Sequence, residues 1–221
     1  MKIVLASRHQ KKIRDLQSRL ASLTTMEIEV LSLDDIGYTE DIVEDGASFA
    51  ENALIKAAVP AKLGYIGVAD DSGLVVDALG GAPGIYSARY SGEHATDGAN
   101  NEKLLSEMES VADEKRGAAF VSEIACVLPA GVEGNIPDAI RTVTREGLTA
   151  FTIRGECRGT ILRGARGEDG FGYDPLFYVS SKSRTFAELT PTEKNEISHR
   201  GVAMRAFCAA FTHIFSDILS E

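Results

Sequence analysis

The chain opens on a short apolar run followed by an amphipathic segment. Residues 2–6 (KIVLA) are mostly apolar and predict a short buried strand. Within residues 8–20, Ile13, Leu16 and Leu20 recur at the spacing of one helical face, which predicts a helix. The turn from a strand into a helix exposes backbone N–H groups that suit phosphate, although a plain strand–helix unit with solvated lysines and arginines fits the same spacing.

A second region joins two apolar runs through a short polar stretch. The pattern predicts a buried strand at 66–70, another at 74–79, and a sharp junction at 70–73 between them. Asp70 and Asp71 stand side by side in that junction. Two neighbouring carboxylates repel each other, and burial of either costs free energy unless something compensates. The pair is therefore a candidate for chemistry, although an Asp pair at a strand end is often only a turn.

Helical spacing and capping motifs predict the other helices. SFAE (48–51) and TPTE (190–193) have the form of capping boxes, and Pro60 predicts a kink or early stop in the first of these two helices. Residues 97–108 predict a helix with Leu104, Leu105 and Met108 inward. A last helix follows its N-cap Ser198 and is expected to bury Val202, Phe207, Phe211, Ile214 and Ile218.

Apolar runs at 118–128 and 148–162 predict two more strands, the second split at Gly155 or Gly159. Residues 129–147 are expected to form a surface excursion between them. A Gly-rich turn that carries Phe171 precedes another strand.

The composition limits the kind of protein. The 221 residues are 44% hydrophobic, which suits one globular domain or two lobes sharing a core. No apolar run reaches the ~18 residues of a membrane-spanning helix, and the N-terminus lacks a signal-peptide core. The odd number of widely spaced cysteines argues against a disulfide framework or a zinc site and fits a reducing cytoplasm.

The net charge of −10 argues against nonspecific binding of long nucleic acids, which needs a basic face. A small polyanion could still bind with the help of a divalent cation and a few lysines and arginines. Neither a GxxxxGK[ST] loop nor a GxGxxG motif occurs, so the P-loop and Rossmann interpretations lose their main support. The chain also lacks GxSxG, so a Ser-His-Asp triad is poorly supported.

Four features together describe a Mg²⁺–nucleotide site, although none is specific alone. Carboxylates are the hard oxygen ligands that magnesium takes, lysines can neutralise phosphates, an exposed aromatic turn can stack on a base, and donors at a helix start can read its edge. The residues are, in that order, Glu44, Asp70 and Asp71; Lys12, Lys56 and Lys194; Phe171; and His199 with Arg200.

Four sequence blocks carry a resemblance to a known family. FAENALIKA (49–57), ADDSGLVVDALGGAPGIYSARYSG (69–92), GFGYDPLF (170–177) and TPTEKNEISHRGVAMRA (190–206) resemble the signature blocks of the inosine triphosphate pyrophosphatase family, in the family's order. The enzymes of that family hydrolyse non-canonical purine nucleoside triphosphates. The block around Asp70 is long enough that a chance match is very improbable.

The resemblance implies an α/β fold: a long, mixed, bent β-sheet flanked by helices, forming two lobes with a central active-site cleft. It implies a single pyrophosphatase domain over residues 1–221, a homodimer, and a Mg²⁺ requirement. It implies hydrolysis of ITP, dITP and XTP between the α- and β-phosphates, which gives monophosphate and pyrophosphate.

The resemblance also assigns the site, position by position. Glu44 and Asp71 match metal-linked carboxylates, Asp71 also matches the proposed base, and Asp70 beside it is expected to bind the metal directly or through water. The expected phosphate and substrate contacts are Ser7, His9, Lys12, Lys56, Ser72 and Lys194. The base-binding turn is Phe171, Gly172, Tyr173 and Asp174, and the base-reading pair is His199 with Arg200.

One departure from the family pattern lies in the first turn. The family usually has Thr/Ser-x-Asn-x-x-Lys there, and this chain has His9 in the place of the Asn and Arg8 where a small residue is common. Ser7 and Lys12 fit the pattern. His9 can donate a hydrogen bond but is bulkier than Asn, so the departure concerns the phosphate geometry at this turn.

A mechanism and two alternatives follow. Asp71 accepts a proton from the attacking water, and donors from the His199–Arg200 segment favour the ring oxygen of hypoxanthine and xanthine over the amino group of adenine. A related pyrophosphatase for modified pyrimidine or methylated nucleotides is one alternative, and a non-enzymatic nucleotide sensor is the other.

Overall fold

The computed structural model describes residues 1–24 and 27–216. Its strands form an eight-stranded mixed sheet in the order β2-β1-β3-β4-β6-β7-β8, with β5 paired to β6. β1 runs parallel to β2 and β3, whereas β6 runs antiparallel to β5 and β7. The strands are β1 Lys2–Leu5, β2 Glu29–Leu31, β3 Ile66–Val76, β4 Gly117–Val127, β5 Arg141–Val143, β6 Thr149–Ile161, β7 Phe177–Val179 and β8 Arg184–Thr185.

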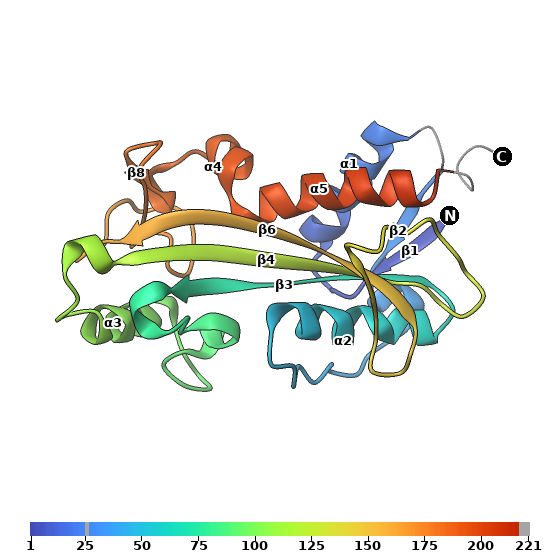
Figure 1. Ribbon diagram of the computed structural model, residues 1–221, viewed down its shortest axis with the longest axis horizontal. Coiled ribbons are helices and arrows are strands. Elements are labelled where there is room, and N and C mark those ends of the chain that lie inside the picture. Colours follow the sequence, from blue (N-terminus) through green and yellow to red (C-terminus); the bar gives the residue numbers. More distant parts are fainter. Residues whose placement is uncertain (25–26, 217–221) are drawn as a thin grey trace. The chain divides into compact units, whose positions relative to one another are not determined.

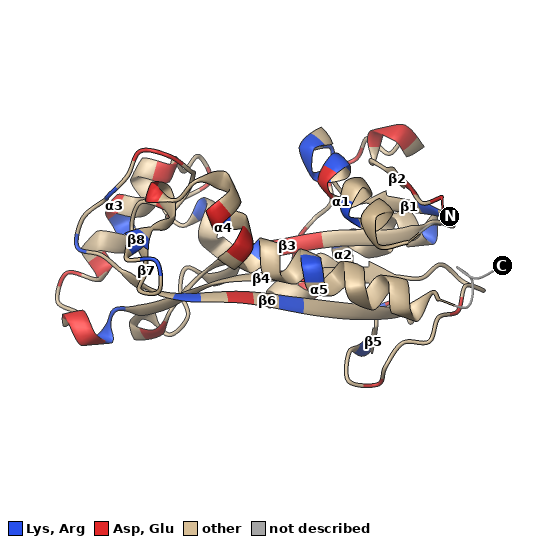
Figure 2. Cartoon of the chain, turned by 90° about the horizontal axis from the view of Figure 1, so that it is seen from above, with Lys and Arg blue, Asp and Glu red and all other residues tan. Residues whose placement is uncertain are grey.

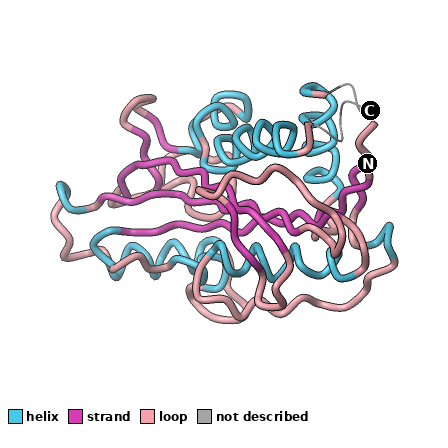
Figure 3. Tube along the Cα trace, turned by 45° about the vertical axis from the view of Figure 1, so that its right-hand side comes forward, coloured by secondary structure: helices cyan, strands magenta, loops and turns pink. Residues whose placement is uncertain are grey.

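Helices lie on the sheet's faces and connect the strands (Figure 1, Figure 3). The α-helices are α1 Gln10–Leu23, α2 Phe49–Lys62, α3 Asp97–Glu107, α4 Pro191–Ile197 and α5 His199–Ile214. The short 3₁₀ helices are Asp34–Ile36, Asp77–Leu79, Gly84–Arg89, Asp113–Lys115 and Phe186–Glu188.

The chain divides into two compact units. Unit 1 comprises residues 1–71, 123–154 and 203–221, and unit 2 comprises residues 72–122 and 155–202. The long strands β3, β4 and β6 each contribute residues to both units.

In unit 1, α1 and α5 pack on one face of the sheet and α2 packs on the other (Figure 1). Ile66 and Val68 of β3 join the first of these cores, with Ile13, Leu16 and Leu20 of α1. Ala69 of β3 joins the second, whose members from α2 are Ala53, Ala57 and Ala61. This alternation is the two-residue period of a strand with both faces covered.

Unit 2 has its own core. Leu74, Leu104, Met108, Phe120 and Phe177 are members of its buried cluster, which joins β3, β4, β7 and α3. The expected inward positions of α3 are therefore confirmed at Leu104 and Met108, while Leu105 is partly buried against the same cluster.

The predicted junction at 70–73 is wrong, because β3 runs unbroken from Ile66 to Val76. Its polar residues interrupt the apolar pattern without turning the chain: Asp70, Asp71 and Ser72 each bond a side chain from another element. The predicted split of the second long strand is wrong for a similar reason: β6 passes through Gly155 and Gly159. At Gly159 a Cβ would lie 2.6 Å from a Phe177 ring atom, so that glycine serves close packing on β7.

The helix-start predictions hold with one difference. Thr190 and Glu193 form a complete capping box, and the Ser198 hydroxyl accepts from the Gly201 N–H at the start of α5. Ser48 caps α2 by accepting from Glu51 N–H, but the Glu51 carboxylate accepts from Ala47 N–H instead of closing the box.

Three further expectations have structural outcomes. Pro60 lies inside α2, which ends two residues later at Lys62. Phe207, Phe211 and Ile214 of α5 are buried, while Val202 is only partly buried and Ile218 lies outside the described residues. The excursion at 129–147 includes the short strand β5.

The three cysteines Cys126, Cys157 and Cys208 are buried free thiols. No helix among the described residues is long and apolar enough to cross a membrane. In Figure 2 basic residues occur on elements that also carry acidic ones, for example on α1 and β6.

Candidate active site

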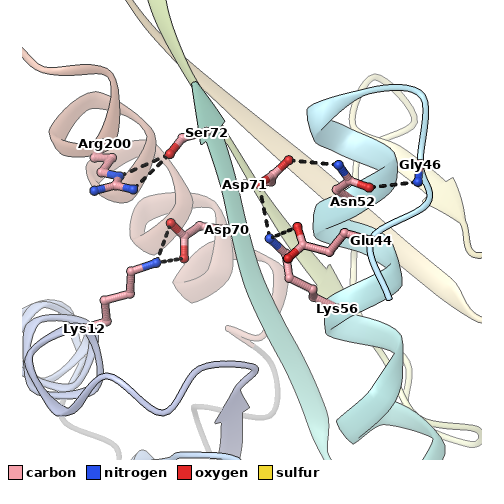
Figure 4. A network of polar contacts seen from close by, with 9 residues as sticks. All are labelled: Lys12, Glu44, Gly46, Asn52, Lys56, Asp70, Asp71, Ser72 and Arg200. Atoms are coloured by element: carbon pink, nitrogen blue, oxygen red, sulfur yellow. Dashed lines mark hydrogen bonds and ion pairs between the residues drawn. The ribbon is translucent and has the colours of Figure 1, made fainter. Parts of the chain in front are cut away.

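In unit 1 the first group of predicted site residues surrounds Asp71 near the middle of β3 (Figure 4). The Lys56 ammonium donates to Asp71 Oδ1 at 3.2 Å and to Glu44 Oε2 at 2.8 Å. The Asn52 amide donates to Asp71 Oδ2 at 3.3 Å. Lys56 therefore lies between two carboxylates that come from distant segments of the sequence.

Small residues bring α2 close enough to β3 to make these contacts. A Cβ at Gly67 would lie 1.9 Å from the Ala57 carbonyl oxygen, so only glycine allows this approach. Asn52 and Lys56 are four residues apart on α2 and share the face that meets Asp71. Asn52 also accepts from Gly46 N–H at 2.9 Å, which ties the segment before α2 to the same face.

Burial raises the pKa of the Asp71 carboxyl, while the charge and hydrogen bonds of Lys56 and the hydrogen bond from Asn52 oppose that rise. Its side chain is 17% exposed. A carboxylate in such a setting binds a proton more readily than one in water, which suits a general base.

Asp70 points to the opposite face of β3, where it accepts from the Lys12 ammonium at 2.7 and 2.9 Å (Figure 4). The two neighbouring carboxylates are thus each compensated by a lysine from a different helix. The structure does not bring the three predicted metal ligands together: Glu44 and Asp71 meet at Lys56, and Asp70 lies with Lys12. Within the described part of the chain, no group of three or more His, Cys, Asp or Glu side chains could hold a metal ion.

The first turn lies between β1 and α1. Ser7 Oγ accepts from His9 N–H at 3.2 Å, and His9 is the exposed N-cap residue of α1 without a side-chain capping bond. Arg8 donates through Nε to Asp34 Oδ1 at 3.1 Å.

In unit 2 a second group of predicted residues forms around the Gly-rich turn. The buried Asp174 carboxylate accepts from Phe171 N–H at 2.9 Å and from the Lys194 ammonium. Gly170 has a positive φ, and a Cβ there would lie 2.3 Å from an Asp174 carboxylate oxygen. Asp174 therefore fixes both the turn and the Lys194 ammonium beside it.

Phe171 is 60% exposed. Lys194 Nζ lies 4.8 Å and Arg200 Cζ 5.5 Å from the centre of its ring. Arg200 also donates to Ser72 Oγ at 3.0 and 3.3 Å (Figure 4). This exposed ring between cations can stack on a planar, electron-rich ligand.

Two predicted base contacts lie in the core instead. Tyr173 is 4% exposed and donates its hydroxyl to the Ser87 carbonyl at 2.9 Å. His199 is 7% exposed, and its ring stacks on Phe120 with a centroid distance of 4.8 Å. Gly172 has a positive φ and is half-buried.

Comparison with known proteins shows to which family this chain belongs. The model of the Ham1 family matches residues 3–210. The chain belongs to the Ham1 family. The resemblance seen in the four sequence blocks is thereby confirmed.

Curated relatives of this Ham1-family chain match it over nearly their whole length. The dITP/XTP pyrophosphatase of Geobacter sulfurreducens is 48% identical over 204 residues, which cover 92% of each chain. The dITP/XTP pyrophosphatase of Mycobacteroides abscessus is 45% identical over 207 residues, 93% of this chain and 92% of the relative.

Solved structures share the fold. The Ham1 protein of Staphylococcus aureus superposes with a TM-score of 0.81 at 37% identity, over 96% of this chain and 98% of the other. A HAM1 protein from Coxiella burnetii gives a TM-score of 0.82 at 39% identity, over the same shares of the two chains. The prediction of an α/β fold with a mixed sheet is confirmed.

Some residues that hold this Ham1-family site were not predicted as site residues. Asn52 is 2% exposed and bonds Asp71; its place four residues before Lys56, on the same helical face, was the available signal in the sequence. Asp97 accepts from Gly172 N–H at 2.6 Å, and Asn101 donates to the Gly172 carbonyl at 3.0 Å. These two residues of α3 fix the base turn, and nothing local in the sequence links them to it.

Proposed function

We propose that this chain hydrolyses the non-canonical purine nucleotides ITP, dITP and XTP to monophosphate and pyrophosphate. The observation that supports this most strongly is membership of the Ham1 family, with curated dITP/XTP pyrophosphatases aligned over more than nine-tenths of both chains. The homodimer stays a prediction, which light scattering of the purified chain tests.

Each unit contributes one part of the proposed nucleotide site. The lysine–carboxylate group of unit 1, with Lys12 and Lys56, handles the phosphates. The turn of unit 2, with Phe171, takes the base. Asp71 and Ser72 are consecutive in β3, so the two groups adjoin along the chain. The two lobes with a central cleft, which the family resemblance implies, stay a prediction.

Magnesium is implied by the family resemblance, and the residues of unit 1 fit it. Lys56 already places a cation between Glu44 Oε2 and Asp71 Oδ1, so these two oxygens can share a positive charge. Mg²⁺ in nucleotide enzymes is held by one or two carboxylates, waters and substrate phosphates. Glu44 and Asp71 would hold it, and when bound it supplies the charge that neutralises the phosphate oxygens.

The chain's own residues then serve the hydrolysis. Asp71, with its raised pKa, accepts a proton from the attacking water. Asn52 keeps the Asp71 carboxylate in place through its second oxygen. Asp70 holds Lys12 at the other face of β3, where Lys12 can turn to a phosphate.

Base selectivity follows from donors near Phe171. A base stacked on that ring lies beside the Arg200 guanidinium, which can donate to the carbonyl oxygen at position 6 of hypoxanthine or xanthine. Adenine carries an amino group at that position and leaves the donor unpaired. The start of α5, where His199 and Arg200 lie, therefore favours hypoxanthine and xanthine.

The product test distinguishes this activity from other phosphohydrolases. With Mg²⁺, dITP is expected to give one pyrophosphate for each dIMP, measured by ion chromatography, and chelation by EDTA is expected to abolish release. Release of orthophosphate with dIDP would contradict the proposed cleavage. Binding of dITP without any product would favour the sensor instead.

Replacing Phe171 with alanine tests the base turn. Loss of base stacking is expected to raise KM for dITP by roughly tenfold, because stacking on an aromatic ring contributes ~1–3 kcal/mol per base. The value of kcat is expected to stay within about threefold, since the lysine–carboxylate residues of unit 1, which handle the phosphates, are unchanged. Steady-state kinetics measure both.

Tyr86→Ala is the matched control, because Tyr86 is another exposed aromatic residue of unit 2, at 56% exposure. It is expected to leave KM unchanged. Equal changes in KM from the two substitutions would remove Phe171 from base binding.

A further inference from the structure

The segment that carries Glu44 is held in place almost entirely by side chains. Among the described residues, the main chain from Thr39 to Ala47 makes no backbone–backbone hydrogen bond. Val43 within it is 76% exposed, so apolar packing does little to fix it. A segment with so few contacts is expected to be mobile unless its ends are anchored.

Arg8 anchors one end. Its guanidinium donates through Nη2 to the carbonyls of Tyr38 at 3.2 Å and Glu40 at 3.0 Å, while Nε donates to Asp34 Oδ1 at 3.1 Å. Nη1 also lies 4.0 Å from Asp41 Oδ1. The planar guanidinium of Arg8 thus bonds a chain segment that is distant from Arg8 in sequence, and it does so at three points.

The other end is anchored from α2 and the β5–β6 turn. Asn52 accepts from Gly46 N–H and Glu51 from Ala47 N–H, both at 2.9 Å. Arg145 donates to Asp45 Oδ1 at 2.7 Å. Between these anchors Glu44 reaches Lys56, so its carboxylate position depends on both ends of the segment.

We infer that Arg8 is a positioning residue for Glu44: it holds the 38–41 backbone and thereby keeps the Glu44 carboxylate beside Lys56 and Asp71. The role of Glu44 rests on the proposed function, whereas the anchoring of the segment does not. Arg8 is one of the two unusual residues of the first turn. Its side chain bonds the segment that follows β2.

The first readout does not use catalysis. Limited digestion with a glutamate-specific protease, followed by mass spectrometry, measures the cleavage rates after Glu40 and Glu44, with the exposed Glu93 of unit 2 as internal reference. Arg8→Ala is expected to raise the two rates roughly tenfold relative to that after Glu93, because cleavage needs local opening of the segment. Arg14→Ala, at an exposed position of α1, is the control and is expected to change nothing.

The second readout is a double-mutant cycle on pyrophosphate release from dITP. Arg8→Ala is expected to lower kcat by about 10- to 100-fold in the unmodified background and by less than about threefold in the Glu44→Gln background. Arg8→Lys keeps the charge without the fork and is expected to fall between Arg8 and Ala.

Unchanged cleavage after Glu40 and Glu44 in Arg8→Ala would overturn the anchoring. Equal losses of kcat in the two backgrounds would overturn the action through Glu44. If the unmodified chain releases no pyrophosphate, the proposed function fails and the protease readout alone decides whether Arg8 anchors the segment.

Discussion

Asp71→Asn is expected to lower kcat for dITP by at least ~100-fold, the range that general-base catalysis supplies. The amide has nearly the shape of the carboxylate, but its single oxygen can accept from only one of the two donors, Asn52 and Lys56, and it cannot accept the proton of the attacking water. Nucleotide binding is expected to survive, because Phe171 and the lysines stay in place. Stopped-time assays of pyrophosphate release and equilibrium binding of dITP measure the two effects separately.

Asp113→Asn provides the matched control. Asp113 is 77% exposed, belongs to unit 2 and pairs with Arg163, which has no part in the site. Its replacement is expected to change kcat by less than about threefold, since exposed ion pairs contribute only ~0–1 kcal/mol. Turnover of Asp71→Asn within about tenfold of the unmodified chain, ~1.4 kcal/mol of barrier, would remove Asp71 from the role of base.

Gly67→Ala is expected to destabilise the fold by about 3 kcal/mol, at the upper end of overpacking effects. The added Cβ would lie 1.9 Å from the Ala57 carbonyl oxygen and 2.9 Å from Pro60 Cγ. The helix backbone cannot give way as a flexible side chain can, so α2 must move off β3. Urea denaturation followed by circular dichroism measures the loss as a lower midpoint at unchanged slope.

The same displacement has a consequence for the site. Asn52 and Lys56 travel with α2, so the folded fraction of Gly67→Ala is also expected to lose activity. Gly98→Ala is the control: its Cβ would meet only Thr96 Oγ1, at 3.9 Å, within α3. That change is expected to be neutral or to stabilise by up to ~1 kcal/mol. Equal midpoints for the two variants would show that Gly67 does not set the distance between α2 and β3.

The sequence located the chemistry of β3 but not its local geometry. Four polar or small residues between two apolar runs have the pattern of a turn, yet β3 stays extended through them. The strand can carry Asp70 and Asp71 because Lys12 and Lys56 meet them on opposite faces. Those lysines come from two different helices, Lys12 58 residues from Asp70 and Lys56 15 residues from Asp71, and no local pattern shows on which face each one packs.

In the turn of unit 2, too, the sequence predicts some features and not others. Its glycines, its exposed Phe171 and the two cations could be predicted from the motifs. The burial of Tyr173 and His199 could not, since it depends on contacts with Ser87 and Phe120 from other segments. The contacts of Arg8 are equally nonlocal, because they join the first turn to a loop about 30 residues later.

Comparison of nucleotides by kcat/KM tests the central claim most directly. Pyrophosphate release is measured for ITP, dITP, XTP, GTP and ATP under the same Mg²⁺ concentration. A site that donates hydrogen bonds to the carbonyl oxygen at position 6 of the purine is expected to prefer ITP, dITP and XTP over ATP by about 10⁴-fold. Equal values of kcat/KM for ITP and ATP would contradict the claim that this chain selects non-canonical purine nucleotides.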